Sequence, residues 1–376
     1  MARQPATHQQ SGAPRRRGDQ AVAHRDQGAT RATAVPIPAA DRAGSAATPL
    51  PVAVDAMGGD NAPNAVVAGA LLAREQHGIP VLLVGPPEAL GETNGLEVLP
   101  ASEVITMDDD PGPAVRHKRD SSLVRAAEAV RDGRAAAMVS AGNTGAAMAS
   151  ALLRMGRLPG LARPAIATPL PVPGTTPTVL LDAGANAECQ PQWLVQFAQM
   201  GSVYSKLRFG IDQPRVGLLS IGEEEAKGTP LVKSAHALLA AGAGVHFLGN
   251  VEGRDILSDR IDVVVTDGFT GNVALKTLEG GVRFFIELVL EVLTSTEEAK
   301  EAARVLLPLL SPIAEVMDPE AQGGAMLLGI DGVCMISHGS SSPRAVANAI
   351  REAHELATQG AVEQLRQSVA RVPGVR

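Results

Sequence analysis

Short runs of valine, leucine and isoleucine alternate with alanine-rich segments from residue 51 onward, and this alternation limits the folds that the chain can adopt. Each apolar run is four to six residues long, as expected of a strand that is buried on both faces. The alanine-rich segments between them have the period of a helix and are long enough to join parallel strands. The sequence therefore predicts an α/β fold, in which a mostly parallel sheet is the middle layer of a three-layer α/β/α sandwich.

The alternation places the expected strands and helices along the chain. We predict strands at residues 52–55, 81–84, 136–140, 178–182, 216–220, 245–248, 263–266 and 332–337. We predict helices at residues 63–76, 121–132, 144–155, 190–206, 229–241, 272–294 and 343–358. Because no repeat or linker interrupts residues 51–376, we expect a single α/β unit there. Residues 284–318 break the alternation and predict a helical projection, and residues 1–50 have the composition of a disordered extension.

Composition and charge exclude several classes of protein. Aromatic residues are only 2% of the chain, so a base-stacking surface for nucleic acid is not expected. The net charge is −7, and residues 1–50 carry +4, so the remaining residues carry −11, which opposes a broad nucleic-acid interface. No apolar run is long enough to span a membrane, and the N-terminus lacks the apolar core of a signal peptide. Cys189 and Cys334 show no metal-binding spacing, so we interpret them as reduced core residues of a cytoplasmic protein.

Seven turns rich in glycine and short polar residues follow the predicted strands. They begin at Asp55, Ser140, Asp182, Ser220, Gly249, Asp267 and His338. Ligands of open α/β sheets bind beyond the carboxyl ends of the strands, so we expect these turns to line one crevice. Glycines let backbone N–H groups approach an anion, and the helices expected to begin near Thr144 and Asn272 add partial positive charge. Together the turns predict a phosphate or oxyanion ligand, although a single turn of this kind is more often a plain helix entry.

The motifs do not support other ligands. The chain has neither the GxxxxGK[ST] loop of P-loop proteins nor a GxGxxG turn that opens a helix after the first strand, so we predict no nucleotide or other cofactor. It also lacks a GxSxG elbow for a nucleophilic serine. Asp55, Asp182 and Asp267 end predicted strands but lack the compact spacing of metal ligands, so we predict no metal and expect these side chains to order the turns.

Five sequence blocks carry a family resemblance, in order, over about residues 52–358. They are VAVDAMGGD at 52–60, VSAGNTG at 139–145, LDAGAN at 181–186, RVGLLSIGEE at 215–224 and VTDGFTGNVALK at 265–276. These blocks resemble the signatures of the PlsX phosphate acyltransferases. Two residues in or beside the fourth block depart from the pattern: Ser220 stands where the family usually has asparagine, and Ala226 where a polar or charged residue is common.

The resemblance implies a homodimer with the α/β fold of isopropylmalate dehydrogenase and phosphotransacetylase, in which residues 51–376 are the catalytic unit. It implies that a fatty acyl group passes from acyl carrier protein to inorganic phosphate as an acyl phosphate. A membrane glycerol-3-phosphate acyltransferase would then use the acyl phosphate for phospholipid synthesis. Because no cysteine lies in a polar turn, we expect phosphate to attack the acyl donor directly. A phosphotransacetylase for short acyl-CoA and a non-catalytic scaffold at the membrane are the alternative hypotheses.

The turns then supply candidate site residues. We expect Lys227 to stabilise the charge of phosphate or of an oxyanion, Asn272 to donate hydrogen bonds, and His338 to protonate the departing thiol. The expected substrate-binding residues are Asp55, Gly58, Gly59, Asn143, Thr144, Gly145, Asn186 and Thr270. Simpler roles are open for all of them: an exposed lysine, a helix cap, or a histidine that orders its own turn.

Two surface features suggest partners. Arg116, Lys118 and Arg119 form a basic cluster that could bind the acidic acyl carrier protein, unless it is only a solvated patch. Residues 284–318 hold apolar runs that charges and prolines interrupt, so they cannot span a bilayer. They could instead touch a membrane surface, or form a hairpin that is buried in the core or in a dimer interface.

Overall fold

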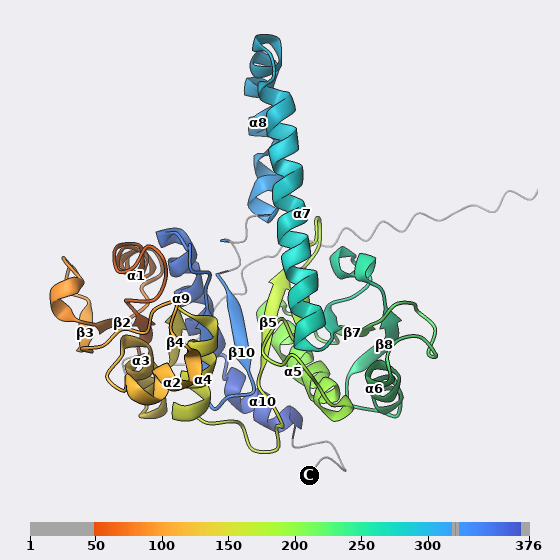
Figure 1. The fold of residues 1–376 in the computed structure, drawn as a ribbon, viewed down its shortest axis with the longest axis horizontal. Coiled ribbons are helices and arrows are strands. Elements are labelled where there is room, and N and C mark those ends of the chain that lie inside the picture. The colour runs from red at the N-terminus through yellow and green to blue at the C-terminus, as the bar shows by residue number, and fades with distance from the viewer. Residues whose placement is uncertain (1–48, 318–319, 321–322, 370–376) are drawn as a thin grey trace, which may run out of the picture. The chain divides into compact units, whose positions relative to one another are not determined.

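The computed structural model describes residues 49–317, 320 and 323–369, which belong to one compact unit (Figure 1). The expected N-terminal extension, apart from its last two residues, lies outside the described residues. An eleven-stranded sheet crosses the unit in the order β3-β2-β1-β4-β11-β10-β5-β6-β9-β7-β8.

The elements follow the predicted alternation of strands and helices. The strands are β1 (Val52–Asp55), β2 (Val81–Gly85), β3 (Glu97–Pro100), β4 (Ala137–Ser140), β5 (Ala165–Leu170), β6 (Thr178–Leu181), β7 (Arg215–Leu219), β8 (His246–Val251), β9 (Val263–Val265), β10 (Ala325–Leu328) and β11 (Val333–Ile336). The helices are α1 (Asn64–His77), α2 (Pro111–His117), α3 (Ser122–Arg131), α4 (Thr144–Arg154), α5 (Pro191–Phe209), α6 (Pro230–Ala240), α7 (Gly268–Thr294), α8 (Glu297–Met317), α9 (Pro343–Thr358) and α10 (Ala361–Val369). All the predicted elements are present, and their ends differ from the prediction by up to four residues.

Two antiparallel strands, β10 and β5, divide the sheet into two parallel sets. Strands β3, β2, β1, β4 and β11 pair in parallel on one side, and β6, β9, β7 and β8 pair in parallel on the other. Because β10 is antiparallel to β11, β5 to β10, and β6 to β5, the two sets run in opposite directions. The prediction of a mostly parallel sheet is confirmed.

Each face of the sheet has its own core. In β1, Val52 and Val54 face one core and Ala53 faces the other, as the two-residue period of a strand requires. Helices α1, α5, α6, α9 and α10 cover the first face, whereas α2, α3, α4 and the first turns of α7 cover the second (Figure 1). The three-layer α/β sandwich is therefore also confirmed.

One row of paired residues crosses the sheet and marks where the parallel strands end. The row is Leu83, Val54, Val139, Met335, Met326, Ala167, Leu181, Val265, Leu218 and Asn250. Each parallel strand in it ends within two residues of the row, although the two sets reach it from opposite directions. The turns that follow both sets thus leave from one line. From β11 to β6, the nearest parallel strands of the two sets, this line covers three strand spacings, about 14 Å, so the turns form two groups along it, and the single crevice stays a prediction.

Two predicted boundaries are wrong for identifiable reasons. Helix α7 begins at Gly268 rather than at residue 272, because Asp267 caps it by accepting a 2.8 Å hydrogen bond from the N–H of Thr270. Strand β8 continues to Val251, so Gly249 and Asn250 lie in a strand and not in a turn. Gly249, with φ 106°, lies at a bulge that lets the pairing with β7 continue past it.

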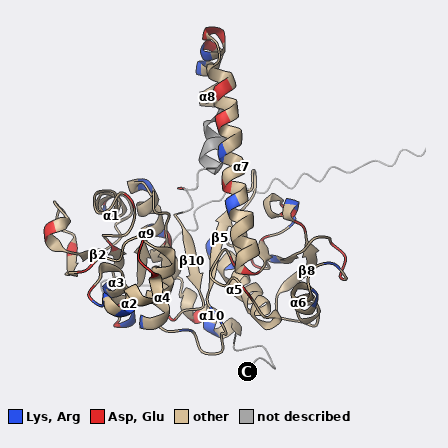
Figure 2. Ribbon diagram, in the orientation of Figure 1, with Lys and Arg blue, Asp and Glu red and all other residues tan. Residues whose placement is uncertain are grey.

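Helices α7 and α8 form a hairpin that extends away from the sheet (Figure 1). Large apolar side chains are exposed on it, among them Phe285 at 67% and Leu309 at 71%. Acidic residues, including Glu297 and Glu298, gather at its tip (Figure 2). The hairpin is not buried in the core, which leaves the dimer interface and the membrane contact as interpretations. Within the described residues, no helix is long and apolar enough to cross a membrane.

Candidate functional site

Three strand ends of the first parallel set meet in what we name the first turn cluster, residues 55–60, 140–145 and 338–340. Asp55 is 2% exposed, and its Oδ2 accepts a 2.7 Å hydrogen bond from the hydroxyl of Ser140. The N–H of Gly142 donates in turn to the Ser140 hydroxyl at 3.1 Å. Burial raises the pKa of Asp55, although hydrogen bonds from Ser122, Ser140 and Met57 oppose the shift. Asp55 therefore orders these turns, as expected of the strand-end carboxylates.

Glycines allow the three turns to touch. A Cβ atom on Gly58 would lie 2.6 Å from Asp55 Oδ2 and 2.8 Å from the backbone nitrogen of Gly142. Gly59 has φ 111°, and the N–H of the next residue, Asp60, donates to the carbonyl of Gly339 at 2.7 Å. Gly58 and Gly59 are thus required by backbone packing, whether or not their N–H groups also meet a ligand.

His338 belongs to the same cluster but already has a local partner. Its Nδ1 lies 2.9 Å from the hydroxyl of Ser340, and the N–H of Ser340 also donates to Nδ1 at 3.3 Å. The imidazole is exposed, so Nε2 is the nitrogen that remains for a substrate. The turn-ordering role of His338 has direct contacts, whereas its role as a proton donor stays a prediction.

The start of α4 holds Asn143, Thr144 and Gly145. Asn143 caps the helix through Oδ1, which accepts from the N–H of Ala146 at 3.1 Å, and its Nδ2 donates to the carbonyls of residues 107 and 109. A Cβ atom on Gly145 would lie 2.7 Å from Pro111, so this glycine packs α4 against α2. The side chain of Thr144 is exposed. Of the three, only Thr144 has a side chain open to a ligand, and Asn143 has the capping role that was the alternative.

The second parallel set forms the second turn cluster, residues 182–186 and 266–272. Asp182 is fully buried, and Oδ1 accepts from the N–H groups of Ile166, Gly184 and Ala185 at 2.9 to 3.2 Å. Its Oδ2 accepts from both the backbone and the side-chain N–H of Asn186 at 2.8 Å. Burial raises the pKa of Asp182 and these donors oppose the rise. Asn186, a predicted ligand residue, is therefore held in place by Asp182.

The first turn of α7 completes the second turn cluster. The N–H of Gly268 donates to the carbonyl of Asn186 at 2.8 Å, and Nδ2 of Asn272 donates to the carbonyl of Ala183 at 3.3 Å. Thr270 is bound to the cap residue Asp267 through both its N–H and its hydroxyl. The structure thus brings Asn186, Thr270 and Asn272 together at the positive end of a long helix, which favours an anion, whereas the Asp267 carboxylate at the same helix end opposes one.

Lys227 lies in the loop between β7 and α6, two strands away from β6. Its side chain is exposed and forms no ion pair within the part of the chain that the structure describes. Nearby Glu223 pairs instead with Arg260 at 3.2 Å. Asn250, which is 6% exposed, donates from Nδ2 to the carbonyl of Glu224 at 2.9 Å and so anchors this loop to β8. Sequence reasoning assigned Asn250 to a turn and missed this role.

The basic cluster on α2 is only partly available to a partner. Lys118 Nζ lies 2.6 Å from Asp109 Oδ2 and also donates to the carbonyl of Val104. The Lys118 ammonium lowers the pKa of Asp109. Arg116 and Arg119 are exposed, and the region around α2 is basic (Figure 2). The Lys118 ammonium thus binds the loop before α2, whereas Arg116 and Arg119 remain candidates for docking of an acidic partner.

The cysteines are poor nucleophiles in this structure. Burial raises the pKa of both Cys189 and Cys334 to about 12, so the thiols are protonated at neutral pH. Cys334 is fully buried in β11, as the core interpretation requires. In residues 49–317, 320 and 323–369, no cluster of three histidine, cysteine or acidic side chains has metal-binding geometry.

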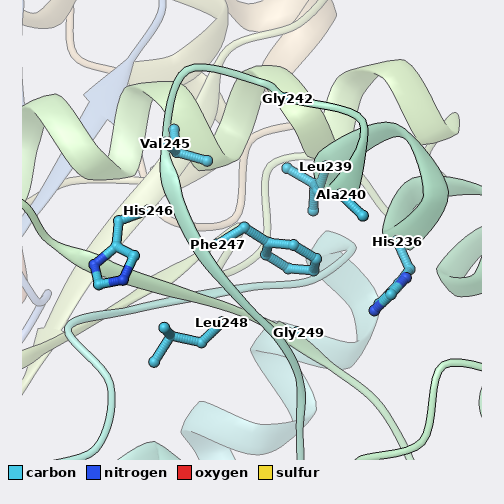
Figure 3. A pocket seen from close by; sticks show the side chains of 9 residues that line it. All are labelled: His236, Leu239, Ala240, Gly242, Val245, His246, Phe247, Leu248 and Gly249. Atoms are coloured by element: carbon cyan, nitrogen blue, oxygen red, sulfur yellow. The ribbon is translucent and has the colours of Figure 1, made fainter.

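Two open hollows mark the surface of the second parallel set. One, along β8, contains none of the predicted site residues (Figure 3); it is lined by His236, Leu239, Ala240, Gly242, Val245, His246, Phe247, Leu248 and Gly249. The other borders the second turn cluster and is lined by Arg163, Ala185, Asn186, Glu188, Cys189, Gln190 and Trp193. The Arg163 guanidinium lies 5.0 Å from the centre of the Trp193 ring. Sequence reasoning missed both residues, although Trp193 is the only tryptophan in the chain.

Comparisons with known proteins give close relatives in sequence. A family profile described as "Fatty acid synthesis protein" matches residues 50–364. The chain is 47% identical over 325 residues to a protein of Nostoc sp. named "Phosphate acyltransferase", a match that covers 84% of this chain and 95% of the relative. A protein of the same name from Elusimicrobium minutum is 47% identical over 329 residues, covering 85% of this chain and 96% of the relative.

Solved structures share the fold at much lower identity. A phosphotransacetylase from Streptococcus pyogenes matches with a TM-score of 0.57 and 16% identity, over 83% of this chain and 94% of its own. A branched-chain phosphotransacylase from Enterococcus faecalis matches with a TM-score of 0.53 and 14% identity, over 82% of this chain and 99% of its own. At these identities the likeness concerns the α/β sandwich alone.

We predict that Gly271→Ala destabilises the protein by about 1–3 kcal/mol, because overpacking a close contact typically costs that much. A Cβ atom on Gly271 would lie 1.9 Å from the backbone oxygen of Asp182, so α7 must shift away from the second turn cluster. Urea unfolding measures the change. Gly280→Ala is the matched control, since Gly280 lies in the same helix with no atom within 4 Å, and its effect should be neutral or slightly stabilising. Equal stabilities of the two variants would contradict the close contact.

Proposed function

Because this chain belongs to the phosphate acyltransferase family, which makes it an acyltransferase, we propose that it moves a fatty acyl group from acyl carrier protein to inorganic phosphate. The acyl phosphate would then serve phospholipid synthesis through a membrane glycerol-3-phosphate acyltransferase. The observation that carries the proposal is the 47% identity to named phosphate acyltransferases over most of both chains. The gathering of Asn186, Thr270 and Asn272 at the start of α7 supports an anionic substrate at the second turn cluster.

In the proposed reaction a phosphate oxygen attacks the thioester carbonyl carbon, and a tetrahedral oxyanion forms. The carbon–sulfur bond then breaks, which leaves an acyl phosphate and the thiol of the donor. Asn272 and the positive end of α7 would stabilise the developing negative charge, and Lys227 would add a full positive charge. His338 would give a proton to the departing sulfur from Nε2, because Nδ1 is engaged with Ser340. This step requires the two turn clusters to approach each other, because His338 follows β11, three strand spacings or about 14 Å from β6. The high pKa of Cys189 agrees with direct attack rather than a cysteine-bound acyl group.

Incubating the purified protein with acyl-[acyl carrier protein] and phosphate, and trapping acyl phosphate with hydroxylamine, tests the proposal. Hydroxamate that depends on both substrates is the expected result, and its absence would reject the proposed reaction. A phosphotransacetylase for short acyl-CoA is the second candidate, because the solved neighbours have that activity in their names. Acetyl-CoA in the same assay separates the two, since it should be the poorer donor here. Family membership argues against the third hypothesis, a non-catalytic scaffold.

We predict that Lys227→Ala lowers the rate of acyl phosphate formation about 100-fold or more, the typical effect of removing one preorganised charge-stabilising group. The midpoint of urea unfolding should stay unchanged, because Lys227 is exposed and forms no ion pair among the described residues. Lys233→Ala is the matched control, as Lys233 is also exposed and lies one turn into α6. A Lys227→Ala rate within about threefold of the parent would remove Lys227 from the mechanism.

We predict that reversing Arg116 and Arg119 to Glu weakens the use of acyl-[acyl carrier protein] more than the use of acyl-CoA. Only the carrier protein presents an extended acidic face, and exposed charges act mainly through the association rate. Lys118 is left unchanged because it holds Asp109. The ratio of kcat/KM for the two donors, measured at low and high salt, gives the answer. Equal losses for both donors would assign the cluster to another role, and no loss would leave it a solvated surface.

We propose that the hairpin of α7 and α8 pairs with that of a second copy in a homodimer, and that the dimer is cytoplasmic with peripheral contact to the membrane. The exposed apolar side chains lie at residues 284–292, in the second half of α7, and at residues 305–309, in the middle of α8, whereas the tip between the helices is acidic and would repel anionic lipid. Exposed apolar side chains at matching heights of both helices, below an acidic tip, suit packing against another helical hairpin better than deep insertion of the tip.

We predict that Leu306→Glu combined with Leu309→Glu shifts the protein from dimer to monomer in analytical ultracentrifugation, because two buried charges would oppose the pairing. Binding to lipid vesicles should fall in the same variant if the dimer is the form that reaches the membrane. Leu153→Glu is the control, since Leu153 is similarly exposed but lies on α4. If the double variant stays dimeric but loses vesicle binding, the apolar side chains contact the membrane and not a second copy. If it keeps both the dimer and vesicle binding, the side chains serve neither contact.

A further inference from the structure

The hollow beside the second turn cluster holds a cationic side chain that the fold does not neutralise. Arg163 is exposed, and no carboxylate lies within 4.0 Å of it in the described part of the chain. Its guanidinium instead stacks 5.0 Å from the ring centre of Trp193, which is half-buried and packs on the core of the first face. The stacking limits the rotamers of Arg163 while leaving its N–H groups free to bind.

The backbone of Arg163 is tied to the candidate site. The next residue, Pro164, is buried, and its carbonyl accepts a 2.8 Å hydrogen bond from Nδ2 of Asn186. Asn186 in turn binds Asp182 and the first residue of α7. Asn186 also lines the hollow, so one residue borders both the second turn cluster and the hollow. The position of Arg163 is therefore set by the same contacts that order the candidate site.

The other polar groups of the hollow suit an anion, with one exception. Gln190 is exposed and can donate through its side-chain amide, and the Cys189 thiol stays neutral because burial raises its pKa to about 12. Glu188 is the exception: its exposed carboxylate would oppose an anion. It forms no ion pair with Arg163 and so does not neutralise that guanidinium.

We propose that Arg163, stacked on Trp193, binds a phosphate group in this hollow. A planar guanidinium offers paired N–H donors that match two oxygens of a phosphate. If the proposed function holds, the substrates supply two phosphate groups that could bind here: free inorganic phosphate and the phosphate of the pantetheine arm that carries the acyl group. Both present the same chemistry to Arg163, so the experiment must separate them.

The single tryptophan makes the hollow observable without turnover. Trp193 is the only tryptophan of the full chain, so its emission reports the state of the Arg163 stack. The full-length protein is titrated with potassium phosphate against potassium chloride at matched ionic strength, and with 4′-phosphopantetheine against pantetheine. We expect a saturable change in emission with a phosphate-bearing probe and none with chloride or pantetheine. Saturation by inorganic phosphate alone identifies that substrate, and saturation by 4′-phosphopantetheine at much lower concentration identifies the donor arm.

Three variants test the residues. Arg163→Gln should weaken the apparent affinity about tenfold or more, because it removes a charge-assisted pair of hydrogen bonds. Arg163→Lys should fall between it and the parent, since it keeps the charge but loses the fork, and it serves if Arg163→Gln does not fold. Glu188→Gln should strengthen binding about twofold to threefold by removing the opposing charge at the surface.

Two results would overturn the proposal: no saturable response to either phosphate probe, or an affinity that is unchanged in folded Arg163→Gln and Arg163→Lys. The site and the proposed function can fail separately. If the protein binds phosphate beside Trp193 but makes no acyl phosphate, the proposed reaction is rejected and this site stands. If substitution of Arg163 changes neither acyl phosphate synthesis nor the emission response to phosphate, the reaction stands and the site is rejected.

Discussion

The carboxylate of Asp182 is the contact on which the second half of the molecule depends. A fully buried carboxylate costs several kcal/mol unless donors surround it, and Asp182 receives five N–H groups from the start of β5, the turn after β6 and the side chain of Asn186. These donors fix the turn, and the turn then positions α7, because the carbonyls of Ala183 and Asn186 accept hydrogen bonds from the helix. The candidate anion site thus depends on the hydrogen bonds to Asp182. The residues that would bind substrate are held by the same turn that donates to this buried carboxylate.

Each parallel set of strands has a buried aspartate at a strand end, and the two aspartates accept hydrogen bonds from different numbers of donors. Asp55 is as deeply buried as Asp182, but its partners are mainly hydroxyl groups of Ser122 and Ser140, with the Met57 N–H at 3.4 Å. Among the described residues both carboxylates are held by hydrogen-bond donors and not by a cation, and burial raises the pKa of each. The register of the sheet brings the two sets to one line from opposite directions, and the antiparallel strands β10 and β5 keep them about three spacings apart between β11 and β6. A ligand as long as an acyl pantetheine could lie along this line, whereas a single phosphate could reach only one cluster.

The periodicity of the sequence predicted the layers and most elements, because apolar runs of the right length between alanine-rich helices permit few other arrangements. It missed β3, α2 and α10. It also missed β5, which contains Pro169, and β10, which has only four residues after two glycines, since neither has the flanking pattern of a crossover strand. The site was predicted at the level of turns and not of roles. Asn143 was expected to bind substrate, yet its side chain caps α4 and holds two carbonyls; a capping residue and a ligand residue look the same in sequence. Arg163 was missed because stacking on Trp193 joins residues 30 positions apart that no local motif connects.

The charge of the chain explains why local cations matter. Residues 51–376 carry −11, so the mean field of the folded part repels phosphate and an acidic carrier protein alike. Screening at physiological salt reduces this repulsion beyond about 8 Å, whereas a cation or helix end that touches the ligand is screened far less. Binding of anions must then come from groups within contact distance: the start of α7, Lys227, and the guanidinium of Arg163. Lys227 and Arg163 form no ion pair in the described residues, in contrast to Lys118, which pairs with Asp109, whereas the start of α7 already carries the Asp267 carboxylate as its cap. A protein of this charge can therefore select its anions by geometry, because its overall field attracts none of them.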